Sequence, residues 1–150
     1  MRNPLIGVFV TLLVLATSLF AQDRTDVRDQ RAKQMLLGKH MISLQWISWD
    51  HLGRGTVTIK KGSYLLVGEQ KGRGNTDFLK INGRITAIDA NQFDFDGTIE
   101  TQVSHINGGK PCVRSGKFTF RITGKRKYWR MQQIDNPCDE AADYVDIYFR

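Results

Sequence analysis

The sequence predicts an all-β domain of about eight antiparallel strands, strongly curved or closed into a small barrel. From about residue 35 onward, apolar and polar residues alternate in short runs that are separated by Gly, Asn, Asp and Lys clusters. Such a period of two is typical of strands with one buried face. The breaks are too short for parallel crossovers, which need about a dozen residues, so neighbouring strands should be antiparallel. A β-sandwich is the alternative, because it is built from strands of similar length and spacing.

Ahead of this domain, the first 21 residues have the layout of an export signal. Arg2 precedes an almost wholly apolar run from Leu5 to Leu15, and Ala21 is followed by polar Gln22 and Asp23. This arrangement predicts a removable signal peptide, with a retained membrane anchor as the alternative. We expect the rest of the chain to be exported, periplasmic or secreted, with no further transmembrane segment.

Residues 22–34 are rich in charged and amide side chains and should form a polar tether or a short frayed helix. The single all-β domain then covers 35–150. The pattern predicts strands at about 40–49, 55–60, 63–71, 77–88, 92–105, 112–123, 126–135 and 143–149. Removal of Arg2 with the leader lowers the formal net charge from +7 to +6, so the exported chain remains basic.

Glycines recur inside four of these strands, at Gly68, Gly83, Gly97 and Gly116. Residues paired across antiparallel strands have a constant sum of residue numbers, and the midpoints of these glycine pairs fall at or next to the predicted turns. We therefore expect the four glycines to face one another in a single row. Such a row lets a sheet bend sharply, or lets another group lie against its backbone, as in a functional groove.

Cys112 and Cys138 are the two cysteines of the chain. An even number of cysteines in an exported domain predicts a disulfide, whose contribution would be stability. For the hairpin between them, a two-residue turn at Gly124 and Lys125 pairs Phe120 with Trp129. The three histidines lack ligand-like spacing to the cysteines, so we expect neither a metal site nor another cofactor.

The strand at 92–105 alternates most clearly, and its apolar face should point to the core. In the following strand, Arg114 shares a face with two phenylalanines. An inward Arg114 could pair with a carboxylate or another anionic head group, whereas an Arg114 at the rim would reach water. The aromatic residues that we expect to contact the apolar part of a ligand are Trp46, Phe93, Phe95 and Trp129.

No catalytic motif is recognisable, so we expect a protein that is not an enzyme. Asp94, Asp96 and Glu100 alternate on one strand face, which should point outward, and Asp50 with His51 has no identifiable nucleophile. Cations and aromatics occur together in residues 121–130, a combination found in single-strand nucleic-acid platforms. Alternation disperses these cations over both faces, and export makes nucleic acid an unexpected partner.

The predicted meander is similar in architecture to lipocalin-like barrels, although the Gly-x-Trp of their first strand is absent. Gly38 and Trp46 are eight residues apart, and no Gly lies two places before Trp49. The sequence thus predicts an exported noncatalytic module that binds a modest apolar or amphipathic ligand in, or at the mouth of, a curved sheet. The alternative is an envelope interaction or structural protein whose basic surface contacts an anionic polymer, a membrane or a protein partner.

Overall fold

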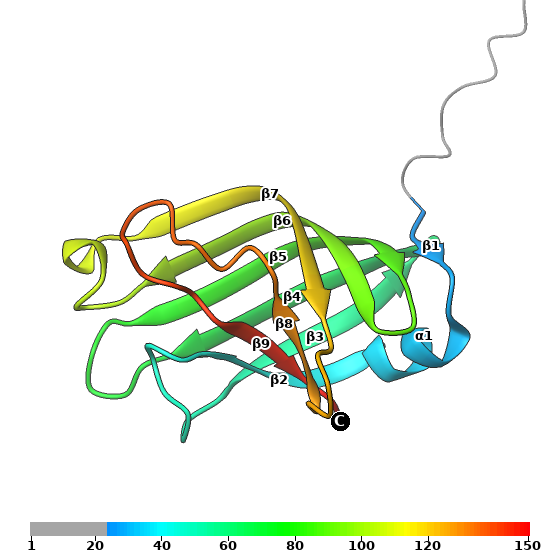
Figure 1. Ribbon diagram of the computed structural model, residues 1–150, viewed down its shortest axis with the longest axis horizontal. Helices are drawn as coiled ribbons and strands as arrows, with labels where there is room; N and C mark the ends of the chain where they lie inside the picture. The colour runs from blue at the N-terminus through cyan, green and yellow to red at the C-terminus, as the bar shows by residue number, and fades with distance from the viewer. Residues whose placement is uncertain (1–23) are drawn as a thin grey trace, which may run out of the picture.

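The computed structural model describes residues 24–150, which form a closed barrel (Figure 1). The signal peptide expected at residues 1–21 lies outside the described residues. The strands of the barrel are β2 (Gly38–Leu44), β3 (Gly53–Lys60), β4 (Ser63–Lys71), β5 (Phe78–Ile88), β6 (Gln92–Gln102), β7 (Cys112–Arg121), β8 (Tyr128–Met131) and β9 (Val145–Tyr148). The other elements are β1 (Asp26–Val27), α1 (Gln30–Leu36) and a 3-10 turn at Asn107–Gly109.

The strand order confirms the predicted antiparallel meander and its closure into a barrel. Each strand from β2 to β9 pairs with its neighbours in sequence, and β9 returns to β2 through the pair Ile42 and Ile147. β1 is a short parallel strand that pairs with Ala87 and Ile88 at the end of β5, beyond the residues of β5 that pair with β4. All eight predicted strands are present, with ends that differ by a few residues, and the β-sandwich alternative does not apply.

Two glycine rows, rather than one, allow the sheet to close. Gly83, Gly97 and Gly116 face one another across β5, β6 and β7, as predicted. The predicted pairing of Gly68 with Gly83 is wrong by two residues, because Gly68 lies opposite Ile81 on one side and Gly55 on the other. The connection from β4 to β5 sets this register, since the Gly72 amide donates to the Asp77 carbonyl across the loop.

The β7–β8 hairpin is also shifted by two residues from the predicted register. Phe120 pairs with Met131 instead of Trp129, because β7 ends at Arg121 and the Ile122 amide donates to the Asn91 carbonyl of the β5–β6 turn. A longer connection therefore replaces the predicted two-residue turn. A shift of two leaves every side chain on its predicted face, so Trp129 and Met131 are both buried.

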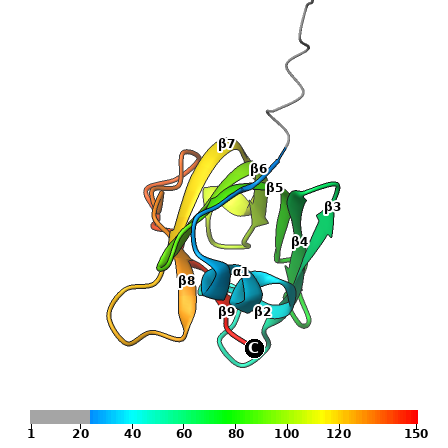
Figure 2. The same ribbon diagram turned by 90° about the vertical axis from the view of Figure 1, so that its right-hand side faces the viewer.

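The segment expected to form a polar tether or a short frayed helix contributes to the fold, because the short helix α1 begins within it at Gln30. The Asp29 side chain caps α1 by accepting a hydrogen bond from the Ala32 amide at 2.6 Å. Ala32 and Leu36 are buried in the core, so α1 covers one end of the barrel (Figure 2). Polar composition obscured this role because only one narrow face of the short helix is apolar.

The opposite end of the barrel carries the predicted disulfide, which joins Cys112 to Cys138. β8 is short, and the chain after Met131 runs beside β7 in an irregular path before returning as β9 (Figure 1). The disulfide fixes this irregular segment to the start of β7. The predicted disulfide between Cys112 and Cys138 is confirmed, and the fold shows that it joins the irregular segment to β7.

Candidate functional site

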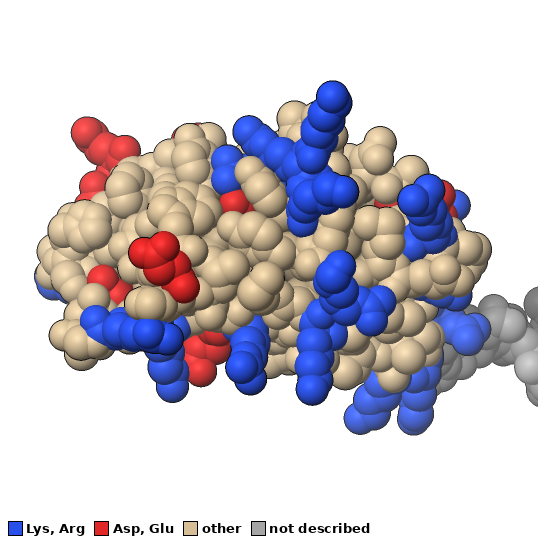
Figure 3. Space-filling view, turned by 90° about the horizontal axis from the view of Figure 1, so that it is seen from below, with Lys and Arg blue, Asp and Glu red and all other residues tan. Residues whose placement is uncertain are grey.

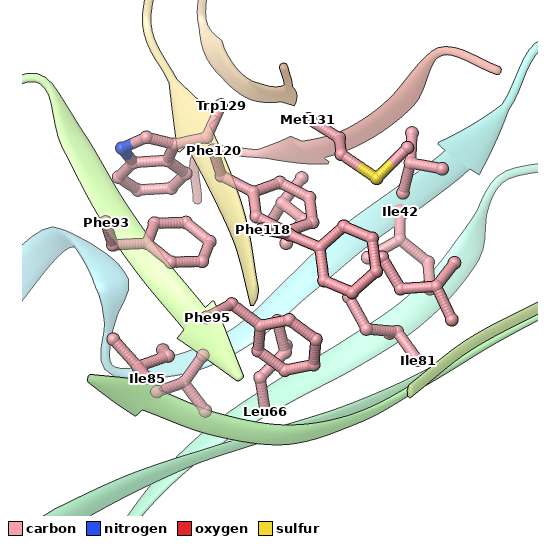
Figure 4. Packing of buried hydrophobic residues seen from close by; sticks show 14 of the residues in the cluster. Ile42, Leu66, Ile81, Ile85, Phe93, Phe95, Phe118, Phe120, Trp129 and Met131 are labelled. Atoms are coloured by element: carbon pink, nitrogen blue, oxygen red, sulfur yellow. The ribbon is translucent and has the colours of Figure 1, made fainter. Parts of the chain in front are cut away.

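Three of the four aromatic residues predicted to contact a ligand belong to the packed core of the barrel. Phe93, Phe95 and Trp129 are each at most 1% exposed. Phe93 stacks on Phe120 with ring centroids 4.9 Å apart, and the Trp129 ring meets Phe93 edge-on at 5.9 Å. Figure 4 shows these rings meeting aliphatic side chains from the opposite wall. Their structural role is therefore the close packing of the barrel interior.

Phe95 occupies the space inside the row of Gly83 and Gly97. A Cβ atom built on Gly97 would lie 2.5 Å from the Phe95 Cζ, and one built on Gly83 would lie 2.6 Å from the same atom. The glycine row thus accommodates a side chain of the core on its inner face. The row was predicted either to let the sheet bend or to let another group lie against its backbone. The geometry shows both, because the sheet bends at the row and the Phe95 ring lies against it.

On the outside of the same bend lies a polar groove of about 700 Å³. Arg84 and Lys117 line it together with Asp94 and Asp96, two of the acids predicted to point outward. Arg84 lies directly across from Asp96, which in turn lies across from Lys117. The alternating signs balance one another, so this groove has no strong preference for a charged ligand.

Arg114 points into the disulfide end of the barrel, where its own chain supplies the carboxylate. Its side chain is 9% exposed, and Nη1 lies 3.9 Å from Oδ2 of Asp143. Burial lowers the pKa of the Arg114 guanidinium, against the opposing effect of the Asp143 and Asp135 charges. The guanidinium also lies over the Phe118 ring at 5.4 Å. Among the described residues, Nη1 is the buried side-chain atom that lacks a hydrogen-bond partner.

Trp46 lies at this same end, on the chain leading from β2 to β3. Its Nε1 donates to the Ala142 carbonyl at 3.1 Å, and its ring meets His105 edge-on at 5.8 Å. Burial raises the pKa of the neighbouring Asp143 carboxyl, an effect opposed by a hydrogen bond from Asn136 and by the charge of Arg114. The structure thus brings Arg114 and Trp46 together around Asp143, and separates them from Phe93 and Trp129. Their contacts fasten the irregular segment to the barrel.

A groove that the sequence did not reveal crosses the outer face of β2. Lys39 and Met41 on β2, Arg54 on β3, and Phe149 with Arg150 after β9 line a pocket of about 380 Å³. A second pocket of about 490 Å³ shares Phe149 and Arg150 and continues to Arg31, Gln34 and Met35 of α1. We call the two adjoining pockets the basic groove. No acidic side chain is among their lining residues.

Local geometry holds one cation of the basic groove in place. The Arg150 guanidinium donates to the Gln34 carbonyl at 2.8 Å and lies over Gly38, where an added Cβ would be 3.0 Å from Nη1. Gly38 has a φ of +105°, a backbone conformation that favours glycine. Gly38 therefore provides both the turn after α1 and the space in which Arg150 lies.

The floor of the groove is fixed by His40. Its Nδ1 lies 2.8 Å from the Tyr148 carbonyl oxygen, and its Nε2 lies 2.7 Å from the Leu36 carbonyl oxygen. His40 is buried, with 4% of its surface exposed. These contacts tie the end of α1 to β9, on either side of the groove.

The basic groove combines cations that have no ion-pair partner with accessible apolar surface. Within residues 24–150, neither Lys39 nor Arg54 forms an ion pair. Met41, between them, is 50% exposed. Figure 3 views this side of the molecule and shows Lys and Arg gathered over its middle and right, with most acidic side chains at the left. Positive charge beside apolar surface suits an anionic amphiphile.

Sequence reasoning missed this groove because its residues come from four separated segments. Lys39 and Met41 alternate outward on β2, which was a usable signal, but Arg54 comes from β3 and Phe149 follows β9. Only closure of β9 onto β2 places the end of the chain beside Lys39. Neither spacing nor composition contains that information.

Within residues 24–150, no group of three or more His, Cys, Asp or Glu side chains is arranged to hold a metal ion. Over the same residues, no helix has the length and apolar character needed to cross a membrane.

The fold and the groove define a small disulfide-bonded antiparallel β-barrel with a basic outer groove. The chain belongs to the PM1083 family, whose model matches residues 24–149. It is 40% identical over 149 residues to a protein of Pasteurella multocida strain Pm70 described as "Uncharacterized protein PM1083", an alignment that covers 99% of this chain and 96% of that protein. The comparison with solved structures gave no match.

Proposed function

We propose that the chain is an exported, noncatalytic binding module that holds an anionic amphiphile of modest size in the basic groove. The observation that carries this proposal is the convergence of Lys39, Arg54 and Arg150 around Met41 and Phe149. Cations of this kind contact a phosphate, sulfate or carboxylate head, while the apolar side chains cover the start of an alkyl chain. The disulfide is consistent with export, because such bonds persist in oxidising compartments.

The packing of the barrel interior favours a ligand site in the basic groove over the interior site expected from the sequence. A barrel that holds its ligand inside needs an apolar cavity, whereas here Phe93, Phe95 and Trp129 pack in the middle of the core. The amphipathic character of the expected ligand is retained, and the site moves from the interior to the outer face of β2.

The proposal is tested by calorimetric titration of the disulfide-bonded protein with dodecyl phosphate below its micelle concentration. Dodecyl maltoside, with the same alkyl chain and a neutral head, is the matched ligand. We expect dodecyl phosphate to bind and the neutral amphiphile to bind far more weakly. In K39Q/R54Q, affinity for dodecyl phosphate should fall at least about tenfold, as expected for loss of contacts to charged groups.

The control is K80Q/K117Q, which removes the same number of cations from the outer faces of β5 and β7. Lys80 and Lys117 are exposed and lie outside the basic groove, so this variant should bind dodecyl phosphate as the unsubstituted protein does. Equal losses in the two variants would assign binding to net charge alone, and equal affinity for the two amphiphiles would remove the role of the anionic head. Either result overturns the proposal.

A further inference from the structure

The end of the barrel covered by α1 has a second cationic feature, at the tip of the β3–β4 hairpin. Lys60, Lys61 and Gly62 form this tip, with Lys61 and Gly62 at positive φ angles of 51° and 84°. Ile59, just before the tip, is 54% exposed, and both lysines are exposed. The tip therefore places accessible apolar surface directly beside two cations.

Arg24 extends the positive charge of this tip. Its Nε would lie 2.7 Å from a Cβ built on Gly62, so the guanidinium packs against the turn. The backbone fixes this arrangement, because the Thr25 amide donates to the Gly62 carbonyl at 3.1 Å and the Tyr64 amide donates to the Thr25 hydroxyl at 2.9 Å. We call Arg24, Ile59, Lys60 and Lys61 the hairpin tip.

The acids near this end are engaged with other groups. Asp26 and Asp89 both pair with Arg28, at 2.7 and 3.2 Å, and Asp29 caps α1. Within the described part of the chain, neither Lys60 nor Lys61 has an ion-pair partner. The opposite end of the barrel carries exposed Asp139 and Glu140 together with exposed Arg73 and Lys110. An anionic surface attracts the exposed lysines of the first end, which have no acidic partner among the described residues.

The position of Arg24 adds a geometric argument. In the sequence, the apolar run that ends at Ala21 is separated from Arg24 by Gln22 and Asp23. Even a fully extended chain spans only about 3.5 Å per residue, so a bilayer that contains this run lies within roughly 10 Å of the hairpin tip. This holds for a retained anchor and equally for a signal peptide before its removal. The hairpin tip is therefore the part of the barrel that the sequence brings closest to a membrane.

We propose that the hairpin tip docks this end of the barrel onto the surface of an anionic phospholipid bilayer. Lys60, Lys61 and Arg24 approach the lipid phosphates, and Ile59 enters the boundary between head groups and acyl chains. This narrows the anionic envelope component expected from the sequence to a membrane surface. The proposal does not depend on a ligand in the basic groove, because the two sites share no residue.

Residues 24–150 are the protein for the test, since they contain the complete core and close the barrel without the apolar run. That run would bind bilayers by itself and hide the effect. The measurement is co-sedimentation with vesicles of phosphatidylcholine that contain about one third phosphatidylglycerol, against vesicles of phosphatidylcholine alone. Binding should require phosphatidylglycerol. It should weaken strongly between about 0.1 M and 1 M salt, because the screening length becomes shorter as the salt concentration rises.

The variant K60Q/K61Q should bind the anionic vesicles about thirty-fold more weakly, which corresponds to about 1 kcal/mol for each basic residue near the surface. I59S, made in the otherwise unsubstituted protein, should also weaken binding to the anionic vesicles, but it should leave the salt dependence of binding in place. R73Q/K110Q is the matched control, because both side chains are exposed and lie near the opposite end of the barrel. It should bind like the unsubstituted protein.

Three results would overturn the proposal: no binding to the anionic vesicles, the same binding to neutral vesicles, or equal losses in K60Q/K61Q and R73Q/K110Q. The last would mean that net charge, rather than the hairpin tip, governs the contact. Urea denaturation of each variant checks that the fold is intact. Because all the substituted side chains are exposed, the free energy of unfolding should change little. Titration of K60Q/K61Q with dodecyl phosphate separates the two sites, because it should leave the basic groove unchanged.

Discussion

Replacing Gly97 with alanine tests whether close approach of strands at the glycine row is what closes the barrel. The added Cβ would lie 2.4 Å from the Asn82 carbonyl oxygen, 2.5 Å from the Phe95 Cζ and 2.6 Å from the Gly83 Cα. Carbon atoms in contact are normally about 3.5–4.0 Å apart, so the neighbours must retreat by about 1 Å. Two of the three are backbone atoms of β5, which cannot move without disturbing the β5–β6 ladder.

Overpacking of a core generally costs about 1–3 kcal/mol, and backbone clashes place Gly97→Ala at or above the upper limit. A loss of about 3 kcal/mol is a large part of the 5–15 kcal/mol typical of a domain, and should lower Tm by roughly 10 °C. Urea denaturation followed by circular dichroism measures the loss. Phe95→Leu in the same chain should recover only a part, because it leaves the contacts with Asn82 and Gly83.

Thr98→Ala is the control for Gly97→Ala. Thr98 is the next residue of β6 and faces outward, and its replacement removes the γ-methyl group and a hydroxyl contact with Ser115 at 3.2 Å. Its free energy of unfolding should fall by no more than about 1 kcal/mol. If Gly97→Ala unfolds at the same urea concentration as Thr98→Ala, the argument that the row requires glycine for strand approach is refuted.

Further expectations concern the contacts that hold the short strands and the disulfide end. Replacing Cys112 and Cys138 with serine should cost about 3 kcal/mol, measured by urea denaturation against the oxidised protein, and equal stability would show that the bridge constrains little. Arg130→Met should cost about 3–5 kcal/mol, because it leaves fully buried Asp146 without its two hydrogen bonds of 2.7 Å; a loss below about 1 kcal/mol would contradict this. Asp143 has a raised pKa, so the folded state binds its proton more tightly than the unfolded state does. The stability that this proton contributes is present below the pKa of the unfolded state and is lost as pH rises through the pKa of the folded state. The free energy of unfolding lost in Asp143→Asn should therefore be larger at about pH 4 than at about pH 7, and a loss independent of pH would contradict the assigned shift.

Local alternation was enough to predict the strands, but not every register between them. The strand face of each residue survived even where the pairing was wrong, since both errors were shifts of two. Gly68 was assigned to Gly83 by symmetry of the turn, whereas in the fold it approaches Gly55, in a strand where sequence reasoning had recognised no interior glycine. Loop hydrogen bonds decide such registers, and their partners are distant in sequence.

The candidate site was less predictable than the fold, for a related physical reason. Phe93, Phe95 and Trp129 were chosen because a hollow barrel would present them to a ligand, but the same alternation also describes a packed core. Arg114 was expected either on an inner face or at the rim, and its carboxylate partner Asp143 comes from the irregular segment after β8. Whether an interior is filled depends on side-chain packing across the barrel, which a pattern along one strand does not encode.

Because the interior is packed with side chains, substitutions that change binding are tolerated more readily on the outer surface of this fold than in its core. Core substitutions alter packing at the glycine rows, so a change that opened a cavity near Phe95 would also weaken the sheet bend that closes the barrel. Lys39, Met41, Lys60 and Lys61 lie on exposed surface and carry no such constraint. The basic groove and the hairpin tip can therefore vary in charge independently of the fold, and of each other. For the groove, the structural requirement that remains is Gly38, which must stay small for Arg150 to lie against it.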